Sequence, residues 1–225
     1  MQLPQHPPQS IEDLMTSANQ LAGLTLGDLA KQANIQVPVD FKRQKGWSGQ
    51  LLELWLGASA GSRPEHDFPQ LGVELKSLPL SKLGTPAETT YVCYAPLLGQ
   101  ESISWEKSNV YNKLQTVLWI PIDGERNIPP SERVIGSPIL WTPNDEQLAA
   151  LRADWEEIME RISLGEIESI TARHGEVLQL RPKAADGSQL TDAIGAKGTL
   201  IKTRPRGFYL RKNFTHQILI DAFGA

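Results

Sequence analysis

Residues 67–76 of this 225-residue chain read DFPQLGVELK, and they are the most informative stretch of the sequence. The stretch contains two carboxylates, Asp67 and Glu74, and a lysine, Lys76, two positions after the second carboxylate. In a β-strand, residues two positions apart project from the same face. We therefore expect Glu74 and Lys76 to point together, while the apolar residues on either side of Glu74 pack into the core behind them.

This cluster has the parts needed to hydrolyse a phosphodiester. Asp67 precedes the predicted strand and is expected to fold back over it. Two carboxylates can hold a hard divalent cation such as Mg²⁺ through oxygen ligands. A lysine beside them can orient a water molecule and offset developing negative charge. The alternative is an exposed charge pair on a strand surface, and the short pattern alone does not exclude it.

Glu53 is a third carboxylate of interest, because it lies within an apolar segment, residues 46–57, GWSGQLLELWLG. The apolar residues follow helical spacing on most faces, which predicts a largely buried helix that ends at Gly57. A buried carboxylate is costly unless it is paired or binds a metal. We expect Glu53 to converge with Asp67 and Glu74, and the alternative is a narrow exposed face of the helix.

The composition limits the class of protein. Hydrophobic residues make up 40% of the chain, enough for a substantial core in one large domain or two lobes. No apolar run reaches the length of a membrane span, and the polar, proline-rich start is unlike a signal peptide. With one cysteine, Cys93, which we expect in the core or on a strand, we predict a cytoplasmic protein without an internal disulfide. No His/Cys spacing indicates a zinc site.

The net charge of -4 conceals an uneven distribution of charge. Residues 143–168 contain eight acids, Asp154 among them, and two bases. Between residues 181 and 212 the chain has two acids and eight bases: Arg181, Lys183, Lys197, Lys202, Arg204, Arg206, Arg211 and Lys212. Because local field matters more than net charge, the basic segment favours contact with DNA. The alternative is a solvated surface.

The predicted elements give an α/β fold with a mixed sheet flanked by helices. Helices are predicted from Ser10, from Thr25, around Glu53, over 104–113, after Asn144, over 188–194 and from near Asn213. Strands are predicted over 71–78, 89–95, 115–120, 134–141, 176–180 and 208–210.

The same residues carry a resemblance to a known family. The matching stretches are KGW (45–47), LELWLGASAGS (52–62), Asp67, GVELK (72–76), ETT (88–90), VLWIP (117–121), GSP (136–138), ITARHGE (170–176), RPKAA (181–185) and PRGFYL (205–210). On these stretches, which extend from about residue 21 to about residue 214, the chain resembles the MutH family. That family comprises methyl-directed mismatch-repair endonucleases, whose core is shared with type II restriction endonucleases.

The resemblance implies a restriction-endonuclease-like core with two arms, residues 1–97 and 98–225, that form a DNA-binding cleft. It implies a Mg²⁺-dependent nick just 5′ to the G of hemimethylated GATC, in the unmethylated strand, leaving a 5′ phosphate. Glu53, Asp67 and Glu74 would hold the metal and, with Lys76, carry out catalysis. The alternatives are a dimeric restriction-type enzyme that cuts both strands and a DNA-binding module without catalysis.

Six residues are expected to contact DNA: Lys45, Tyr91, Arg181, Pro182, Lys183 and Tyr209. Arg181 and Lys183 flank Pro182 after a predicted strand, and largely because of the resemblance we expect Arg181 to read a guanine rather than contact phosphate alone. With the resemblance, Tyr209 is expected to sense the methyl group on adenine N6, whereas the residues alone favour a core tyrosine. Tyr91 is equally consistent with an ordinary strand residue.

The resemblance also implies protein partners, with MutL acting directly and MutS indirectly. No extra apolar helix is obviously devoted to dimerisation, which favours a monomer that binds double-stranded DNA. His174 is interpreted as a turn residue before a strand, because a lysine-assisted, metal-bound water needs no histidine as general base.

Overall fold

The strand that carries Glu74 and Lys76 lies at one end of a three-stranded sheet. This strand is β1 (Glu74–Leu80), and it pairs in parallel with β3 (Val117–Asp123), which pairs in antiparallel with β4 (Ile139–Trp141). The computed structural model describes residues 2–41, 44, 46–61, 65–99, 103–183 and 188–224. In the parallel pair, Lys76 lies opposite Trp119.

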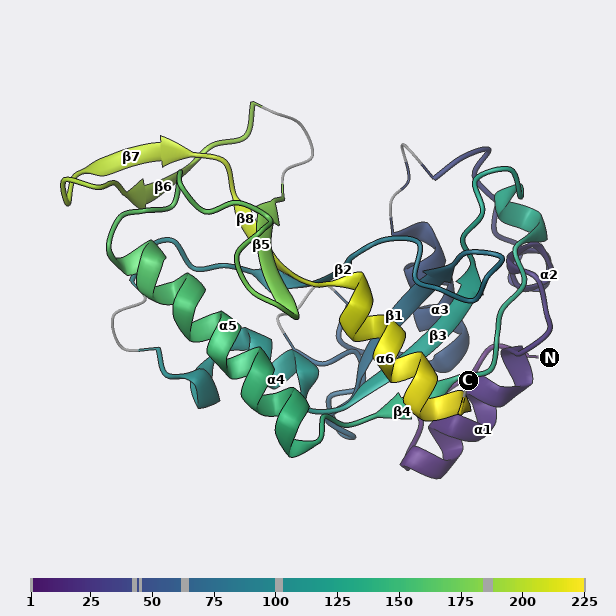
Figure 1. Cartoon of the computed structure of the whole chain (residues 1–225). Coiled ribbons are helices and arrows are strands. Elements are labelled where there is room, and N and C mark those ends of the chain that lie inside the picture. Colours follow the sequence, from purple (N-terminus) through teal and green to yellow (C-terminus); the bar gives the residue numbers. More distant parts are fainter. Residues whose placement is uncertain are drawn as a thin grey trace. The chain divides into compact units, whose positions relative to one another are not determined.

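The chain divides into two units, each assembled from separate stretches of sequence. The first unit contains residues 1–88, 115–142 and 222–225, and the second contains residues 89–114 and 143–221. Figure 1 shows the elements of both units along the chain. The two arms, residues 1–97 and 98–225, and a cleft between them stay predictions.

The first two helices of the first unit begin at the predicted caps, Ser10 and Thr25, and the third ends at the predicted Gly57. They are α1 (Ile11–Leu21), α2 (Leu26–Gln32) and α3 (Trp47–Leu56), with a short 3-10 turn, η2, over Pro130–Glu132. Ser10 caps α1 by accepting a hydrogen bond from the backbone N–H of Asp13 (3.0 Å). Gly57 ends α3 with φ +72°, a left-handed conformation that glycine adopts without steric cost.

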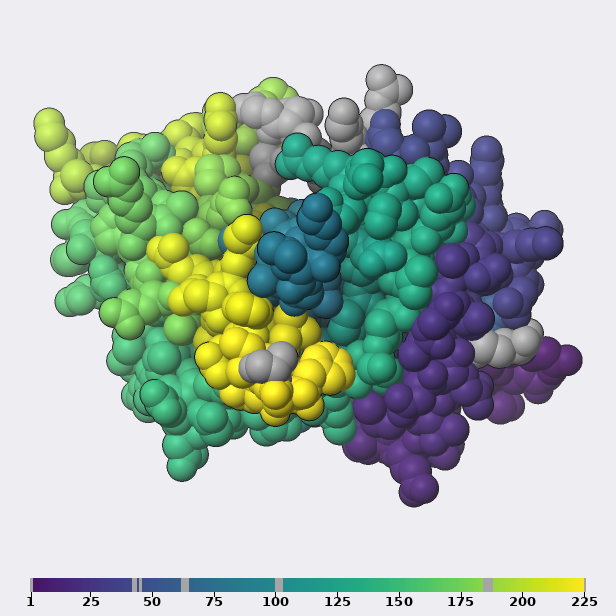
Figure 2. Space-filling model, turned by 45° about the vertical axis from the view of Figure 1, so that its right-hand side comes forward, coloured from purple at the N-terminus to yellow at the C-terminus, as the bar shows by residue number. Residues whose placement is uncertain are grey.

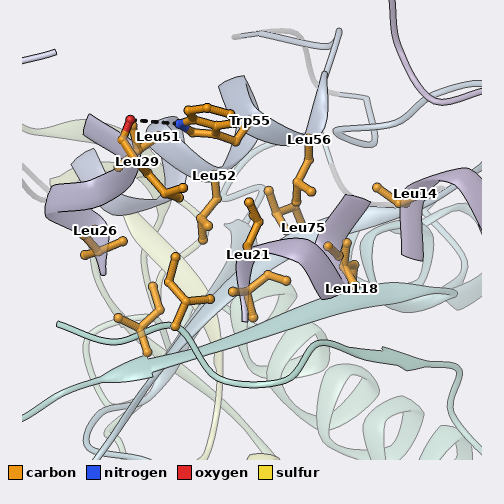
Figure 3. Close-up of a cluster of buried hydrophobic side chains, with 14 of the residues drawn as sticks. Leu14, Leu21, Leu26, Leu29, Leu51, Leu52, Trp55, Leu56, Leu75 and Leu118 are labelled. Atoms are coloured by element: carbon orange, nitrogen blue, oxygen red, sulfur yellow. Dashed lines mark hydrogen bonds between the residues drawn. The ribbon is translucent and has the colours of Figure 1, made fainter. Parts of the chain in front are cut away.

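These helices pack on the apolar face of the β1–β3–β4 sheet and form the core of the first unit. Figure 3 shows leucines of all three helices gathered with Leu75 and Leu118, and the Trp55 indole N–H donating to the carbonyl of Leu29 (3.2 Å). Val73 belongs to the same core, so the residues flanking Glu74 pack behind the strand as expected. In Figure 2 the N-terminal residues, in purple, form a continuous part of the surface of this unit.

The second unit is built around an antiparallel sheet in the order β2–β8–β5. Its elements are β2 (Thr90–Tyr94), η1 (Trp105–Lys107), α4 (Asn109–Leu114), α5 (Asp145–Ser163), β5 (Leu178–Pro182), β6 (Thr191–Ile194), β7 (Leu200–Thr203), β8 (Arg206–Leu210) and α6 (Lys212–Phe223). Helix α4 packs against β2, and the long helix α5 packs against β5. Asn144 caps α5 as predicted, by accepting from the backbone N–H of Gln147 (2.8 Å).

One predicted element is wrong. The segment 188–194 was expected to be a helix, but Thr191–Ile194 is strand β6, paired in antiparallel with β7. A tight turn allows the pairing: Gly195 N donates to Thr199 O (2.9 Å), and Gly198 has φ +71°. The β-branched residues of both strands favour this pairing over a helix. Figure 1 shows the β6–β7 hairpin extending beyond the β2–β8–β5 sheet.

The predicted α/β class is confirmed: a mixed sheet and an antiparallel sheet are each packed with helices. The predicted helix over 104–113 is interrupted at Ser108, whose extended backbone separates η1 from α4. Among the residues that the structure describes, no helix is long and apolar enough to cross a membrane.

Candidate active site and nucleic-acid face

A tight turn over residues 68–73 brings Asp67 next to β1. Phe68 and Val73 bridge the turn: Phe68 N donates to Val73 O (3.0 Å), and Val73 N donates to Phe68 O (3.3 Å). Gly72 has φ +64°, which this reversal requires. The Asp67 carboxylate then accepts a hydrogen bond from the backbone N–H of Leu75 (2.8 Å). The expected fold-back of Asp67 over the strand is confirmed.

Glu74 and Lys76 form an ion pair that is largely removed from solvent. Lys76 Nζ lies 2.6 Å from Glu74 Oε1, and the two side chains are 16% and 4% exposed. Beside them on the same face of the sheet lie Val117 and Trp119, both 0% exposed. Removing two charges from water is costly, so such a pair is weak support for stability alone. Because both side chains are largely buried, the alternative of a solvent-exposed charge pair is wrong.

Glu53 lies on α3, which packs against β1 within the same unit. Leu51, Leu52, Trp55 and Leu56 are buried, whereas Leu54 is exposed and Glu53 is partly buried. The helix is thus buried along one side and not on most faces. Glu53 sits at the boundary between that side and solvent, where a carboxylate is tolerated more easily than in the core.

The candidate metal ligands are held by neighbouring segments of the first unit. Glu74 starts β1, Asp67 is hydrogen-bonded to the same strand, and Glu53 is on the helix packed against it. Within the described ranges, no group of three or more His, Cys, Asp or Glu side chains is close enough to hold a metal ion. The structure places Glu74 and Lys76 on β1 and Asp67 against that strand, and the convergence of Glu53 with them stays a prediction.

The β2–β8–β5 sheet has one apolar face and one polar face. Paired residues of neighbouring strands point to the same side. The apolar face carries the buried residues Leu178, Leu180, Phe208 and Leu210. The opposite face, here called the aromatic–basic face, carries Tyr91, Tyr94, Gln179, Arg181, Lys183, Gly207 and Tyr209.

Four of the residues predicted to contact DNA form one contact network on this face. Arg181 Nη1 donates to Thr89 Oγ1 (2.7 Å), and the Arg181 guanidinium lies 5.6 Å from the ring centre of Tyr209. Lys183 Nζ lies 4.2 Å from the ring centre of Tyr91. The Tyr91 and Tyr209 rings meet edge to face at 5.3 Å. Both cations thus lie against aromatic rings, an arrangement that stabilises and orients them.

Gly207 makes this packing possible. It lies at the centre of the sheet, opposite Arg181 on β5 and Tyr94 on β2. A Cβ at this position would lie 2.8 Å from Cε2 of Tyr91 and 3.3 Å from Cβ of Lys183. Because no real Cβ approaches a ring atom so closely, only glycine lets the Tyr91 ring lie across β8.

Burial raises the pKa of Tyr91 above the usual phenol value, and Cys93, Tyr94 and Tyr209 add to the rise. We expect Tyr91 to ionise above the usual phenol range in an alkaline titration followed by ultraviolet difference spectroscopy. Because the folded state disfavours the phenolate, this group should lower stability only as the pH rises above about 10. Tyr91→Phe should remove absorbance change from the range above the usual phenol pKa, and an unchanged signal in that range would contradict this.

Besides Arg181 and Lys183, three further bases of the segment 181–212 contact other groups of the second unit. Lys202 pairs with Asp192 (2.9 Å), and Arg206, which is buried, pairs with Glu168 (3.7 Å). Arg211 Nη2 donates to the backbone carbonyls of Ala172 (2.6 Å) and His174 (3.2 Å). The basic segment is therefore partly structural, and Arg181 and Lys183 are its members on the aromatic–basic face.

The other residues singled out in the sequence lie outside this contact network or outside the described residues. Pro182 is exposed at the end of β5, and Lys45 lies outside the described residues. His174 is a turn residue, as predicted, because its Nδ1 accepts from the backbone N–H of Thr171 (3.1 Å). Cys93 is buried on β2, as expected.

The sequence interpretation missed the role of Asp154, which it counted with the acidic segment. Asp154 is 6% exposed, and its carboxylate accepts hydrogen bonds from the backbone N–H groups of Glu176, Val177 and Leu178 at 2.7–2.9 Å. It thereby ties α5 to the start of β5. The signal was present, since position 154 is three residues after Leu151 and lies on the apolar stripe of the helix.

Comparisons with known proteins point to one family. A family model described as DNA mismatch repair enzyme MutH matches residues 56–154, which include Asp67, Glu74 and Lys76. A DNA mismatch repair protein MutH from Klebsiella pneumoniae subsp. pneumoniae is 60% identical over 217 residues, 96% of this chain and 94% of that protein. Proteins of the same name from Shigella boydii serotype 18 and Escherichia coli O1:K1 are each 58% identical over 217 residues, 96% of this chain and 95% of theirs.

Proposed function

The chain belongs to the MutH family of DNA mismatch repair enzymes, and we propose that it nicks the unmethylated strand of hemimethylated GATC sites. It acts as a DNA endonuclease that hydrolyses the phosphodiester just 5′ to the G and leaves a 5′ phosphate. The observation that carries this proposal is the buried Glu74–Lys76 ion pair with the Asp67 carboxylate tied to the same strand.

Mg²⁺ fits the chemistry of the donors, which are the carboxylate oxygens of Asp67, Glu74 and Glu53. When bound, the ion lowers the pKa of a water molecule and polarises the scissile phosphate. The hydrogen bond from Leu75 N fixes one oxygen of Asp67, and the ammonium group of Lys76 contacts one oxygen of Glu74, so both carboxylates are oriented by neighbours on the same strand. EDTA should therefore abolish nicking.

Lys76 is the residue proposed to handle the attacking water. Its ammonium group is directed by Glu74 Oε1 at 2.6 Å, and it sits beside the buried ring of Trp119. In these surroundings of low polarity, a positive charge stabilises a developing pentacovalent phosphate more strongly than it would in water. Lys76 thus orients the water and offsets the added negative charge.

Arg181 is proposed to read a guanine base. Its guanidinium is held by Thr89 and stacked on Tyr209, so its direction is set before DNA arrives. Arginine commonly donates two hydrogen bonds to the O6 and N7 atoms of guanine, and each good pair discriminates against other bases by about 1–3 kcal/mol.

Arg181→Ala should flatten the preference for GATC over sites that differ by one base pair. We expect the specificity ratio, measured as kcat/KM on both substrates, to fall by roughly 10- to 100-fold. Arg173→Ala, at an exposed position of the same unit, is the matched control. An equal loss on all sequences would instead assign Arg181 to a phosphate contact.

Tyr209 is proposed to sense the methyl group on adenine N6. It lies on the aromatic–basic face, packed between Arg181 and Tyr91, so added bulk next to its ring is costly. Tyr209→Ser should raise the nicking rate on methylated sites relative to unmethylated ones. Nicking of unmethylated, hemimethylated and fully methylated duplexes measures this, and unchanged discrimination would remove Tyr209 from the role.

A supercoiled plasmid with hemimethylated GATC sites tests the reaction. With Mg²⁺ we expect nicked circles, and with EDTA no change. Linear product, from cutting of both strands at one site, would favour a dimeric restriction-type enzyme. No cleavage would favour a DNA-binding module without catalysis. The proposal also includes a cytoplasmic monomer that MutL activates directly and MutS indirectly, so purified MutL should raise the nicking rate.

A further inference from the structure

Tyr94 shares the aromatic–basic face because of an irregularity in β2. In a regular strand, residues three positions apart point to opposite faces, which would separate Tyr91 from Tyr94. The pairing of β2 with β8 shifts register between Tyr91 and Cys93, so that Tyr91 lies opposite Tyr209 and Tyr94 lies opposite Gly207. Such a β-bulge re-aims the side chains that follow it. The Tyr91 and Tyr94 rings meet edge to face at 5.8 Å.

Tyr94 is also the most accessible aromatic side chain of this group. It is 57% exposed, whereas Tyr91 and Tyr209 are partly buried. Tyr94 also lines a cavity of about 280 Å³ together with Leu97, Leu98 and other residues of the second unit. The ring is therefore supported by Tyr91, and more than half of the side chain is open to solvent.

We propose that Tyr94 extends the DNA-contact surface and that its hydroxyl donates a hydrogen bond to a backbone phosphate. The inference rests on the proposed function, in which the aromatic–basic face binds duplex DNA. A phenol offers one donor, which suffices for a phosphate oxygen but does not reproduce the two-donor pattern by which arginine reads guanine. The contact positions the duplex and does not select its sequence.

The width of the sheet supports a backbone contact. Across the sheet, β8 lies between β5 and β2. Neighbouring strands lie about 4.8 Å apart, which puts β2 roughly 10 Å from β5. The major groove of B-DNA is about 12 Å wide. With Arg181 of β5 in the groove, a residue on β2 lies near the groove wall, where the phosphates are. Tyr94 is well placed there because it is exposed.

The test compares Tyr94→Phe with the unaltered protein in fluorescence anisotropy, using a hemimethylated GATC duplex and a duplex without GATC, in Ca²⁺ instead of Mg²⁺. We expect Kd to rise about fivefold on both duplexes, the effect of one lost hydrogen bond. The slope of log K against log salt should stay unchanged, because a neutral donor releases no counterion. Lys183→Ala should instead reduce that slope by about one.

Tyr111→Phe is the matched control, because Tyr111 of α4 packs against Trp105 of η1 and is not one of the residues of the aromatic–basic face, so the Kd of this variant should not change. In nicking assays Tyr94→Phe should raise KM and leave kcat unaltered. An unchanged Kd, or a loss confined to the GATC duplex, would overturn the proposal. Failure of the proposed function looks different: the unaltered protein would not nick GATC sites, whatever Tyr94→Phe does to binding.

Discussion

Lys76→Ala is expected to lower the rate of DNA nicking by about 10²- to 10⁴-fold while leaving DNA affinity nearly unchanged. The magnitude is that of a side chain that positions a reacting water or stabilises transition-state charge. The ammonium group is held by Glu74 at 2.6 Å, and the Lys76 side chain is only 16% exposed, so solvent does not readily replace the charge in the same position. Single-turnover nicking and fluorescence anisotropy measure the two quantities separately.

Two further variants make the Lys76 test specific. Lys76→Met keeps an unbranched apolar stem against Trp119 without the charge, and it should be as inactive as Lys76→Ala. Lys82→Ala removes an exposed lysine just after β1 and should leave activity unchanged. A folded Lys76→Met protein that nicks at the normal rate would show that the ammonium group takes no part in the chemistry.

Asp154→Ala is expected to destabilise the protein by on the order of 3–5 kcal/mol. The carboxylate accepts from three consecutive backbone N–H groups at the start of β5, and hydrogen bonds to a charged group contribute roughly 1.5–3 kcal/mol each. Removal leaves these amides without an acceptor near the core, since Leu178 is 0% exposed. Urea unfolding measures the change in the free energy of unfolding. The slope of that free energy against urea concentration should be the same for both proteins.

The same helix provides the control for Asp154. Glu157→Ala removes a partly exposed carboxylate whose pair with Arg161 spans 3.3 Å, and it should change stability by less than about 1 kcal/mol. Asp154→Asn keeps one oxygen acceptor and should fall between the two. Equal effects of Asp154→Ala and Glu157→Ala would mean that the buried carboxylate does not hold β5 to α5.

The elements set by nearby residues were predictable from the sequence. Ser10, Thr25 and Asn144 each accept a hydrogen bond from the third residue of their helix, a pattern that is readable within four positions. The alternation around Glu74 likewise predicted which side chains enter the core. The candidate catalytic residues Asp67, Glu74 and Lys76 could be identified from the sequence for the same reason, because they lie within ten positions of one another.

Features that depend on distant partners were not predictable. The segment 188–194 becomes strand β6 because β7 pairs with it, and a local pattern does not contain that partner. The bulge that turns Tyr94 toward Tyr91 is set by pairing with β8, more than a hundred residues later. Asp154 meets its amides 22–24 residues away, and Arg181 meets Thr89 across 92 residues.

The central claim is that this chain cuts one phosphodiester, chosen by sequence and methylation, with the residues gathered on β1. The most direct measurement uses a short duplex with one hemimethylated GATC, each strand carrying a different label, incubated with Mg²⁺ or with EDTA. The account predicts one product with Mg²⁺: the unmethylated strand cut just before the G, with a 5′ phosphate. Cutting of the methylated strand, a break elsewhere, or undiminished cutting in EDTA would contradict it.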